Sequence, residues 1–414
     1  SKQGQQREPH QRERIGDSEW FGHPLKKKSS DTTRILFHNV NGLELSDESL
    51  TTQLLCKFIV AEEVDICGMA ETNTNWKHKR GRKKLKQITS KYWNRDRLIT
   101  SECLLDWKSL HKPGGTATIV RQPIKHSIVF TGNDSHDLGR WNSCTLRGKN
   151  NQQLTIVTAY RTCKSNPATA GVNTFATQQW IYLEQQEQEE VNLRTKIITD
   201  LGIYINSLRQ QNHEIILMID ANESMTKTNS GISNLISVTQ LCDPIFMLHG
   251  AHKEPNTYIR GSERIDYFFC SPKLLQYIQR CGILPFDMAT TADHRGAYLD
   301  IRISKFLQDH LQEHQEPIQR RLHSTFTKGV IKYKDFLYKY TTNNNITEII
   351  KSIKNKMINN TLQNKDMGII NEVDSKMTKG MLKAEKQIKI RDKHHPWSPT
   401  LALAILTLNL CKLV

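Results

Sequence analysis

Five short segments place polar side chains of catalytic type directly after runs of apolar residues. The segments are 37–43 (FHNVNGL), 69–73 (MAETN), 158–161 (TAYR), 218–223 (MIDANE), and the pair 264–268 (RIDYF) with 291–295 (TADHR). Rigid scaffolds usually display catalytic groups in the loops at strand ends. A single Asp at the end of a strand is more often a turn or cap residue. The combination of Asn, Glu, Tyr, Asp and His is what indicates chemistry.

Oxygen ligands for a hard cation are the first part of this chemistry. Glu71 and Asp293 offer carboxylate oxygens. Asn39 and Asn41 can each add an amide oxygen. Such a set suits Mg²⁺, or Mn²⁺, rather than zinc. The ion would polarise a phosphoryl oxygen and neutralise developing charge. We therefore expect a magnesium site and no small-molecule cofactor.

The second part is proton transfer and phosphate binding. His294 would hold a phosphate, oriented by a carboxylate such as Asp266 in the manner of an Asp–His pair. Asp220 remains as the general base for an attacking water, with Asn222 beside it as a positioning residue. Together with the metal ligands, these groups make up the set needed for metal-assisted hydrolysis of a phosphodiester.

The apolar runs predict the elements that must position these residues. Strands are expected at 34–40, 64–70, 115–121, 143–147, 153–160, 214–220, 264–270 and 297–303. The turn residues at 148–151 predict a hairpin between two of them. Mixed strands and helices with a hairpin argue against an all-parallel doubly wound sheet. They favour two sheets packed face to face with helices outside.

Helical periodicity fills the gaps between strands. Ser46 or Asp47 can cap a helix that runs to about residue 62. One long helix is predicted over 174–211. Its stretch 184–190 (EQQEQEE) is either a solvated face or a loop that breaks the helix in two.

The order of the motifs resembles that of the endonuclease/exonuclease/phosphatase superfamily, which includes DNase I, the apurinic endonucleases, sphingomyelinases and inositol-phosphate phosphatases. The resemblance covers 34–304 and implies a four-layered α/β/β/α sandwich of the DNase I type, with the site at one edge. It matches Asn39 with the Asn of the first strand, Asn41 with the second Asn or Asp, Glu71 with the metal-binding Glu, Tyr160 with the transition-state Tyr, Asp220 and Asn222 with the Asp-x-Asn motif, Asp266 with the Asp that orients the histidine, and Asp293 and His294 with the final Asp-His.

The chain departs from the family pattern at several positions. Ala70 stands where Gln is usual, Ile219 where Gly is usual, and Ala292 where Ser is usual. Arg161–Thr162 occupy the place of a frequent Pro. None of these departures removes a ligand or a proton-transfer group, so they bear on substrate preference more than on catalysis.

Within the superfamily, several motifs resemble the endonuclease domains of non-LTR retroelements. They are Thr-Gln-Gln at 177–179, Asp-Ala-Asn-Glu at 220–223 and Ala-Asp-His-Arg-Gly-Ala at 292–297. Residues 395–401 (HPWSPTL) resemble the segment that often precedes a reverse transcriptase, but no Tyr-x-Asp-Asp motif of a polymerase occurs. The resemblance implies a DNA-nicking endonuclease. A lipid- or inositol-phosphate phosphoesterase and a catalytically inactive nucleic-acid-binding remnant remain the alternatives.

A basic segment follows the metal-ligand strand. Between Lys77 and Arg97 there are ten Lys/Arg and one Asp, with Trp and Tyr interleaved. Cations neutralise backbone phosphates and aromatic rings stack on bases. The candidate nucleic-acid-binding residues are Lys77, Lys79, Arg80, Arg82, Lys83, Lys84, Trp93 and Arg161. We expect DNA as the partner, and the alternative is a solvated basic loop whose aromatics belong to the core.

Charge divides the chain of 414 residues into segments. Of the net charge of +16, residues 1–30 carry +3, 31–304 carry +4 and 305–414 carry +9. We expect a disordered basic arm at 1–30, the superfamily domain at 31–304 and a linker at 305–319. Residues 320–414 would be a basic, mostly helical connector segment that is truncated.

Cysteine use and hydropathy bear on the compartment. The nine cysteines show no Cys-x-x-Cys pair and no metal-ligand spacing, which predicts free thiols in a reducing compartment. No apolar run is long enough to span a membrane, and the N-terminal residues are polar. We therefore expect no membrane partner and no secretory signal, and an intracellular protein with the nucleus as a candidate compartment. The oligomeric state is not determined by these patterns.

Overall fold

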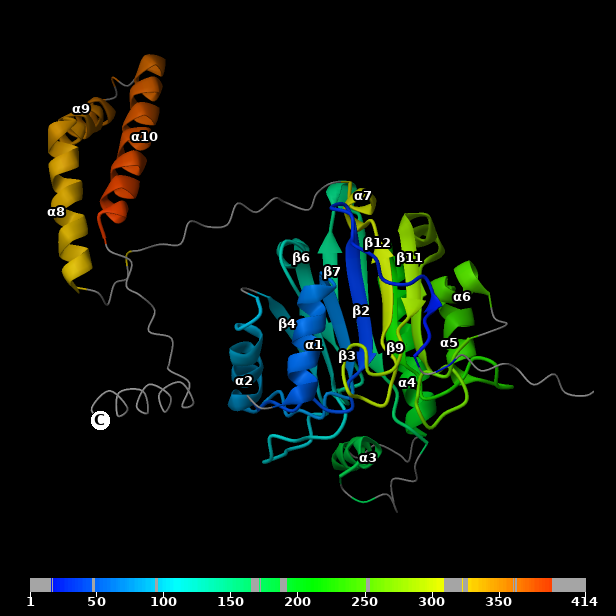
Figure 1. Cartoon of the computed structure of the whole chain (residues 1–414). Helices are drawn as coiled ribbons and strands as arrows, with labels where there is room; N and C mark the ends of the chain where they lie inside the picture. Colours follow the sequence, from blue (N-terminus) through cyan, green and yellow to red (C-terminus); the bar gives the residue numbers. More distant parts are fainter. Residues whose placement is uncertain are drawn as a thin grey trace, which may run out of the picture. The chain divides into compact units, whose positions relative to one another are not determined.

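The computed structural model divides the chain into two compact units, Ser1–Glu313 and His314–Val414 (Figure 1). The residues that it describes are 16, 18–46, 49–93, 96–164, 171, 173–186, 192–250, 254–308, 322, 327–359, 361 and 363–388.

Two β-sheets form the frame of the first unit. The seven-stranded sheet has the order β1 (Phe21–Gly22), β11 (Ile278–Ile283), β12 (Ala297–Ile301), β2 (Thr33–Asn39), β3 (Ile66–Ala70), β5 (Thr116–Val120) and β4 (Arg97–Ser101). The five-stranded sheet has the order β10 (Asp266–Cys270), β9 (His213–Asp220), β8 (Gln153–Tyr160), β7 (Trp141–Arg147) and β6 (Ile128–Asn133). The pairs β2–β3 and β8–β9 are parallel, and the other pairs are antiparallel. Every strand expected from the sequence forms, and β1, β4, β6 and β11 are additional.

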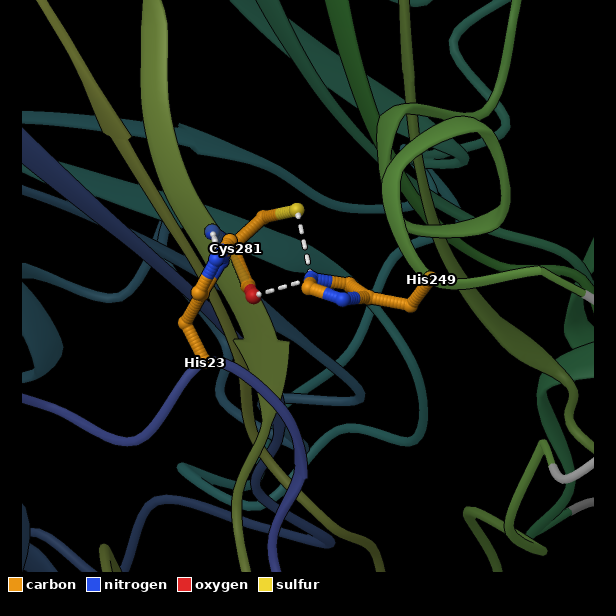
Figure 2. Close-up of side chains that lie close together, drawn as sticks. All are labelled: His23, His249 and Cys281. Atoms are coloured by element: carbon orange, nitrogen blue, oxygen red, sulfur yellow. Dashed lines mark hydrogen bonds between the residues drawn. The ribbon is translucent and has the colours of Figure 1, made fainter.

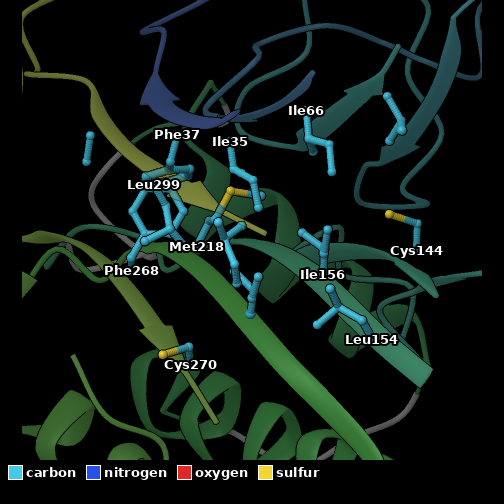
Figure 3. Close-up of a cluster of buried hydrophobic side chains, with 14 of the residues drawn as sticks. Ile35, Phe37, Ile66, Cys144, Leu154, Ile156, Met218, Phe268, Cys270 and Leu299 are labelled. Carbon is cyan, nitrogen blue, oxygen red and sulfur yellow. The ribbon is translucent and has the colours of Figure 1, made fainter. Parts of the chain in front are cut away.

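The two sheets pack face to face through a buried apolar cluster (Figure 3). Successive side chains of a strand alternate between its two faces. Ile35 and Phe37 of β2 therefore share the inner face, where they join Met218 of β9 and Phe268 of β10 in one cluster. This apolar layer fixes the distance between the strand ends that carry polar residues.

Helices cover the outer faces of both sheets. The helices of this unit are α1 (Leu50–Ala61), α2 (Lys79–Thr89), α3 (Phe175–Gln185), α4 (Leu193–Gln210), α5 (Gly231–Thr239), α6 (Pro244–His249) and α7 (Ile303–Phe306). Leu55 of α1 and Leu85 of α2 pack with Leu36, which lies on the outer face of β2. Leu201 of α4 packs with Leu217 of β9 in the same way. The layers are α/β/β/α, as the resemblance implied.

The structure decides one helix prediction and corrects another. The stretch 174–211 forms two helices, which is one of the two alternatives, and Asn192 caps α4 by accepting hydrogen bonds from the backbone N–H groups of Arg194 and Thr195. Residues 187–191, between them, lie outside the described residues. The first helix begins at Leu50, and Ser49 is its cap instead of Ser46 or Asp47. The hydroxyl of Ser49 accepts a hydrogen bond from the backbone N–H of Thr52.

The described part of the expected N-terminal arm packs on the body. Phe21 is buried and pairs with Ile283 of β11. The guanidinium of Arg295 donates to the carbonyl oxygens of Gly16 and Glu19. The expectation of disorder therefore does not hold for 18–30, because the Phe21 side chain and the Glu19 carbonyl oxygen there contact the body.

At the other end, the body extends beyond residue 304. Phe306 and Leu307 are buried in the cluster between the sheets. The second unit is helical, with α8 (Thr327–Asn343), α9 (Ile346–Ile358) and α10 (Asn364–Lys386). The segment 395–401 lies outside the described residues. Among the described helices, none combines the length and apolarity needed to cross a membrane.

Candidate active site

Six of the predicted site residues lie at the same edge of the sandwich. Asn39 ends β2, Glu71 follows β3, Tyr160 ends β8, Asp220 ends β9, Asp266 begins β10, and His294 lies shortly before β12. The parallel pairs β2–β3 and β8–β9 bring carboxyl ends of strands together. Because β10 runs antiparallel to β9, its first residue, Asp266, lies opposite Asp220.

Asn39 joins the two sheets at this edge. Its amide nitrogen Nδ2 donates to Oδ2 of Asp220 at 2.7 Å and to Oε2 of Glu71 at 3.0 Å. Its oxygen Oδ1 accepts from the backbone N–H of Asn41 at 2.9 Å. Asn39 is only 1% exposed. The side chain therefore presents nitrogen, not oxygen, to the carboxylates, and holds them in place.

Asp220 is fully buried among hydrogen-bond donors. Its Oδ1 accepts from the backbone N–H of Asn222 at 2.8 Å. The amide nitrogen of Asn222 donates to the carbonyl oxygen of Arg161 at 2.7 Å and lies 3.4 Å from Oδ2 of Asp220. Burial, followed by the charge of Asp266, raises the pKa of Asp220 to about 8. This carboxyl group can therefore exchange a proton near neutral pH.

Asp266 and His294 form a buried pair beside Asp220. His294 Nδ1 lies 2.9 Å from Oδ2 of Asp266. Burial lowers the pKa of His294, but the charge and hydrogen bond of Asp266 outweigh it and raise this pKa to about 10. The imidazole is therefore charged at neutral pH. Its Nε2 lies 3.5 Å from the amide nitrogen of Asn39, on the side of the catalytic candidates.

Tyr160 reaches the same region from β8. Its ring stacks on Phe175 of α3, with centroids 5.4 Å apart and planes at 17°. Burial and the neighbouring carboxylates of Glu71 and Asp220 raise the pKa of Tyr160 well above its ordinary value. Its hydroxyl therefore stays a neutral donor. At Gly114, with φ +75°, a Cβ would lie 2.2 Å from the Phe175 ring, so this packing requires glycine.

The backbone is strained where these side chains leave it. Asn41, Glu71 and Asn222 have φ of 42°, 52° and 47°. Left-handed backbone is uncommon for residues other than glycine, and least so for Asn. Such residues cluster at functional sites, where the surrounding structure holds them. The strain at Glu71 is therefore consistent with a side chain placed for function.

The donor set at this edge fits a hard divalent cation. Asp293 Oδ1 accepts from the amide nitrogen of Asn41 at 3.1 Å, and Asp293 and Glu71 are both partly exposed. In the part of the chain that the structure describes, no lysine or arginine is ion-paired with Glu71, Asp220 or Asp293. Oxygen donors without a neutralising cation suit Mg²⁺ or Mn²⁺.

A second group of possible ligands, Asp220, Asp266 and His294, has donor atoms within 4.8 Å of one another. The pKa of His294, about 10, keeps its ring protonated at neutral pH, and its Nδ1 is engaged by Asp266. These three groups therefore suit proton transfer and anion binding when no metal occupies the triad.

Most of the expected nucleic-acid-binding cations lie on or next to α2. Lys77, Arg80, Arg82 and Lys83 are exposed and Lys84 is half-buried. Lys79 begins the helix, and its side chain lies outside the described residues. Leu85 and Ile88 hold the opposite face of α2 against the body.

Two of the candidate nucleic-acid-binding residues are not available for that role. Trp93 is 8% exposed, its indole N–H donates to Asp96, and the Arg121 guanidinium lies 5.3 Å from its ring centre. It is part of the core and cannot stack on a base. Arg161 is 4% exposed and its guanidinium is 2.6 Å from Glu223. Glu223 already neutralises the charge of Arg161, so this side chain is not free to bind a phosphate.

Sequence patterns missed two aromatic residues of the site. Phe175 supports the Tyr160 ring, as described above. The Tyr258 ring lies 5.1 Å from the His294 ring, at 40°. No spacing or neighbouring motif distinguishes either aromatic from an ordinary core residue.

The fold is similar to several solved structures. AP endonuclease LMAP from Leishmania major is 15% identical, with 68% of this chain and 93% of that chain covered and a TM-score of 0.48. The catalytic domain of Xenopus laevis APE2 is 13% identical, with 65% of this chain and 92% of that chain covered and a TM-score of 0.44. The endonuclease domain of TRAS1, a telomere-specific non-LTR retrotransposon, is 15% identical, with 65% of this chain and 98% of that chain covered and a TM-score of 0.39. These structures are of the endonuclease/exonuclease/phosphatase superfamily. No protein-family model and no curated protein matches the sequence. The chemistry of this chain therefore has to follow from its own residues.

Proposed function

We propose that the protein is a divalent-metal-dependent phosphodiesterase that nicks DNA, of the retroelement endonuclease type, by in-line attack of water. The observation that carries the proposal is the hydrogen-bonded series Glu71–Asn39–Asp220 beside the Asp266–His294 pair at one edge of the sandwich. It combines a cation ligand, a base and a charged donor within one site.

Asp220 is the base in this proposal. Its pKa of about 8 places its titration near working pH, where a general base is most effective. The donors from Asn39 and Asn222 fix the orientation of its carboxylate. A water molecule that reaches this carboxylate loses its proton to Asp220 as it attacks phosphorus.

His294 and Tyr160 bind the scissile phosphate. Asp266 engages Nδ1 of His294, which leaves Nε2–H to donate to a phosphate oxygen. The positive charge of this ring attracts the phosphodiester and the charge that develops on it. Tyr160, a neutral phenol, adds a second donor.

Glu71 and Asp293 hold the cation, with Asn41 fixing Asp293. When bound, a Mg²⁺ ion polarises the phosphoryl oxygen and neutralises charge on the leaving oxygen. Asn39 contributes by holding Oε2 of Glu71.

The surface of α2 supports DNA as the substrate. This helix (KRGRKKLKQIT) has six Lys/Arg and no acidic residue, and it comes shortly after Glu71 in the chain. Exposed cations release counterions from a nucleic-acid backbone, which is a sequence-independent source of affinity. The motifs at 177–179 and 220–223 support the retroelement type.

The test is a plasmid-nicking assay with Mg²⁺, run beside bis-nitrophenyl phosphate and sphingomyelin. Nicking should require the metal and should fall by about 10²-fold or more in Asp220→Asn. Asp300→Asn is the matched control, because Asp300 is also buried but pairs with Arg34 away from the site. Nicking that survives EDTA, or an unaffected Asp220 variant, refutes the mechanism. Preference for sphingomyelin would assign a lipid phosphoesterase, and DNA binding without hydrolysis would assign an inactive binding domain.

A further inference from the structure

Three potential metal ligands from distant parts of the sequence meet at the edge of the seven-stranded sheet (Figure 2). His23 follows β1, His249 ends α6 and Cys281 lies within β11. Their ligand atoms all lie within 4.8 Å of one another. None of these residues belongs to the catalytic candidates.

The separations are close to those of a zinc site. Sγ of Cys281 lies 3.8 Å from Nε2 of His249. Nδ1 of His23 faces the backbone N–H of Cys281 at 3.4 Å, and the two imidazole rings are 4.5 Å apart at 75°. Ligands at about 2.0–2.3 Å from one tetrahedral ion stand roughly 3.3–3.7 Å apart. Small side-chain rotations would therefore bring all three onto a common centre.

We propose that His23, His249 and Cys281 bind a zinc ion that is separate from the catalytic cation. One thiolate and two imidazoles form a softer donor set than the oxygens near Glu71, and such a set selects zinc over magnesium. Three protein ligands leave the fourth coordination position to water. Both histidines are partly exposed, so the ion can enter from solvent.

The role of this ion is to fasten the N-terminal segment to the body. The strand β1 has two residues, and among the described strands it pairs with β11 alone. Gly22, with φ +79°, lets the chain approach closely, because a Cβ there would lie 2.8 Å from Cδ2 of His249 and 2.9 Å from the carbonyl oxygen of Cys281. Only two residue pairs join β1 to β11 in the described ladder. A zinc ion would add a link between β1, α6 and β11 at this point.

The simpler reading is a hydrogen-bonded thiol. Sγ of Cys281 lies 3.6 Å from the carbonyl oxygen of Pro244, and Nε2 of His249 lies 3.1 Å from that of Cys281. These contacts satisfy the groups without a metal. Direct measurement of metal binding separates the two readings.

The experiment is a Co²⁺ titration of the full chain after removal of metals with a chelator. Zinc binding predicts a sulfur-to-cobalt charge-transfer band that saturates at one equivalent and disappears when Zn²⁺ is added. The catalytic cation site predicted here has oxygen ligands and produces no such band. This readout is therefore independent of nicking activity.

Substitutions identify the ligands. Cys281→Ser should remove the band, and His23→Gln and His249→Gln should each weaken Co²⁺ binding by about tenfold or more, since even outer-shell partners change affinity that much. Cys144→Ser, a buried cysteine outside the cluster, and Cys163→Ser, an exposed one, should leave the band unchanged.

A second measurement reports on the N-terminal segment. Trypsin cleavage after Lys26 and Lys27 should slow when Zn²⁺ is added to the intact protein, and His23→Gln should abolish the slowing. The proposal is overturned if the intact protein shows no thiolate band, or if the band persists in Cys281→Ser. It is also overturned if a folded His23→Gln protein binds Co²⁺ and resists trypsin as the intact protein does.

Discussion

Replacing Asp266 with Asn tests the electrostatic design of the site most sharply. Asn keeps the size of the side chain and can still accept a hydrogen bond from Nδ1 of His294. It removes the buried charge that raises the pKa of His294 to about 10. Burial then lowers this pKa, while the charges of Asp220 and Asp293 still raise it, so without the Asp266 charge it should fall to about the ordinary value of 6.5.

The size of the effect follows from the two protonation fractions. At about pH 8, His294 is ~99% charged with a pKa of about 10 and ~3% charged with a pKa of about 6.5, a loss of roughly 30-fold. At this pH Asp220 loses both the Asp266 charge that raises its pKa and the His294 charge that lowers it, so its ionisation should change little. The net expectation is a loss of ~30-fold at pH 8 that grows to roughly 300-fold at pH 9.

The loss of nicking rate in the Asp266→Asn variant should shrink as the pH falls. Near pH 6 the imidazole of the variant is largely charged and its Asp220 is more ionised than in the unaltered protein, so the two rates should converge or cross. The assay is single-turnover plasmid nicking at saturating Mg²⁺ from about pH 6 to pH 9. Asp300→Asn controls for the loss of a buried carboxylate elsewhere. A variant whose profile has the same shape as that of the unaltered protein, merely scaled down, would show that the charge of His294 does not drive the reaction. Adding His294→Gln to Asp266→Asn should cause no further loss of nicking rate at pH 8, because the two residues act as one unit.

Three further outcomes are expected. Glu71→Gln should lower nicking by about 10²-fold or more and raise the Mg²⁺ concentration needed for half-maximal rate, with an unchanged near-ultraviolet spectrum; a normal Mg²⁺ titration would exclude Glu71 as a ligand. Charge reversal at Arg80 and Lys83 should weaken binding to all DNA sequences alike and reduce the salt slope by roughly one per cation, as followed by fluorescence anisotropy, while the rate at saturating DNA stays constant; an unaltered slope would assign these cations to solubility. Phe306→Ala should lower the free energy of unfolding by about 3–5 kcal/mol in urea titrations, because the ring is buried between the sheets, whereas the exposed Tyr338→Ala should have little effect; equal effects would place residue 306 outside the body.

Asn39, Tyr160 and Asp220 can be predicted from the sequence because each is the last residue of one strand. An apolar run that ends in a polar residue indicates both the strand and the point at which the chain leaves it. The layer order also follows, since strands that alternate between two faces, with amphipathic helices between them, have few ways to bury their apolar sides. The break in 174–211 was visible as one of two alternatives, and its acidic, Gln-rich composition gave no means of choosing.

Only the tertiary structure decided which polar or aromatic groups are accessible. Trp93 and Arg161 have side chains typical of nucleic-acid binding. Trp93 is buried in the core, however, and Arg161 is ion-paired with Glu223. Burial depends on neighbours that are distant in sequence, which no local pattern contains. The pKa values of Asp220 and His294 depend on the same distant neighbours, because they arise from burial and from charges on other strands.

The His23, His249 and Cys281 cluster shows the same limit most clearly. Metal-ligand motifs can be identified in a sequence when a short loop supplies the ligands. Here the three ligands come from the N-terminal segment, a helix end and the strand next to the sheet edge, and their spacing in the chain shows no pattern. The pairing of β1 with β11 and the packing of α6 bring them together, and these contacts form only when the sandwich closes.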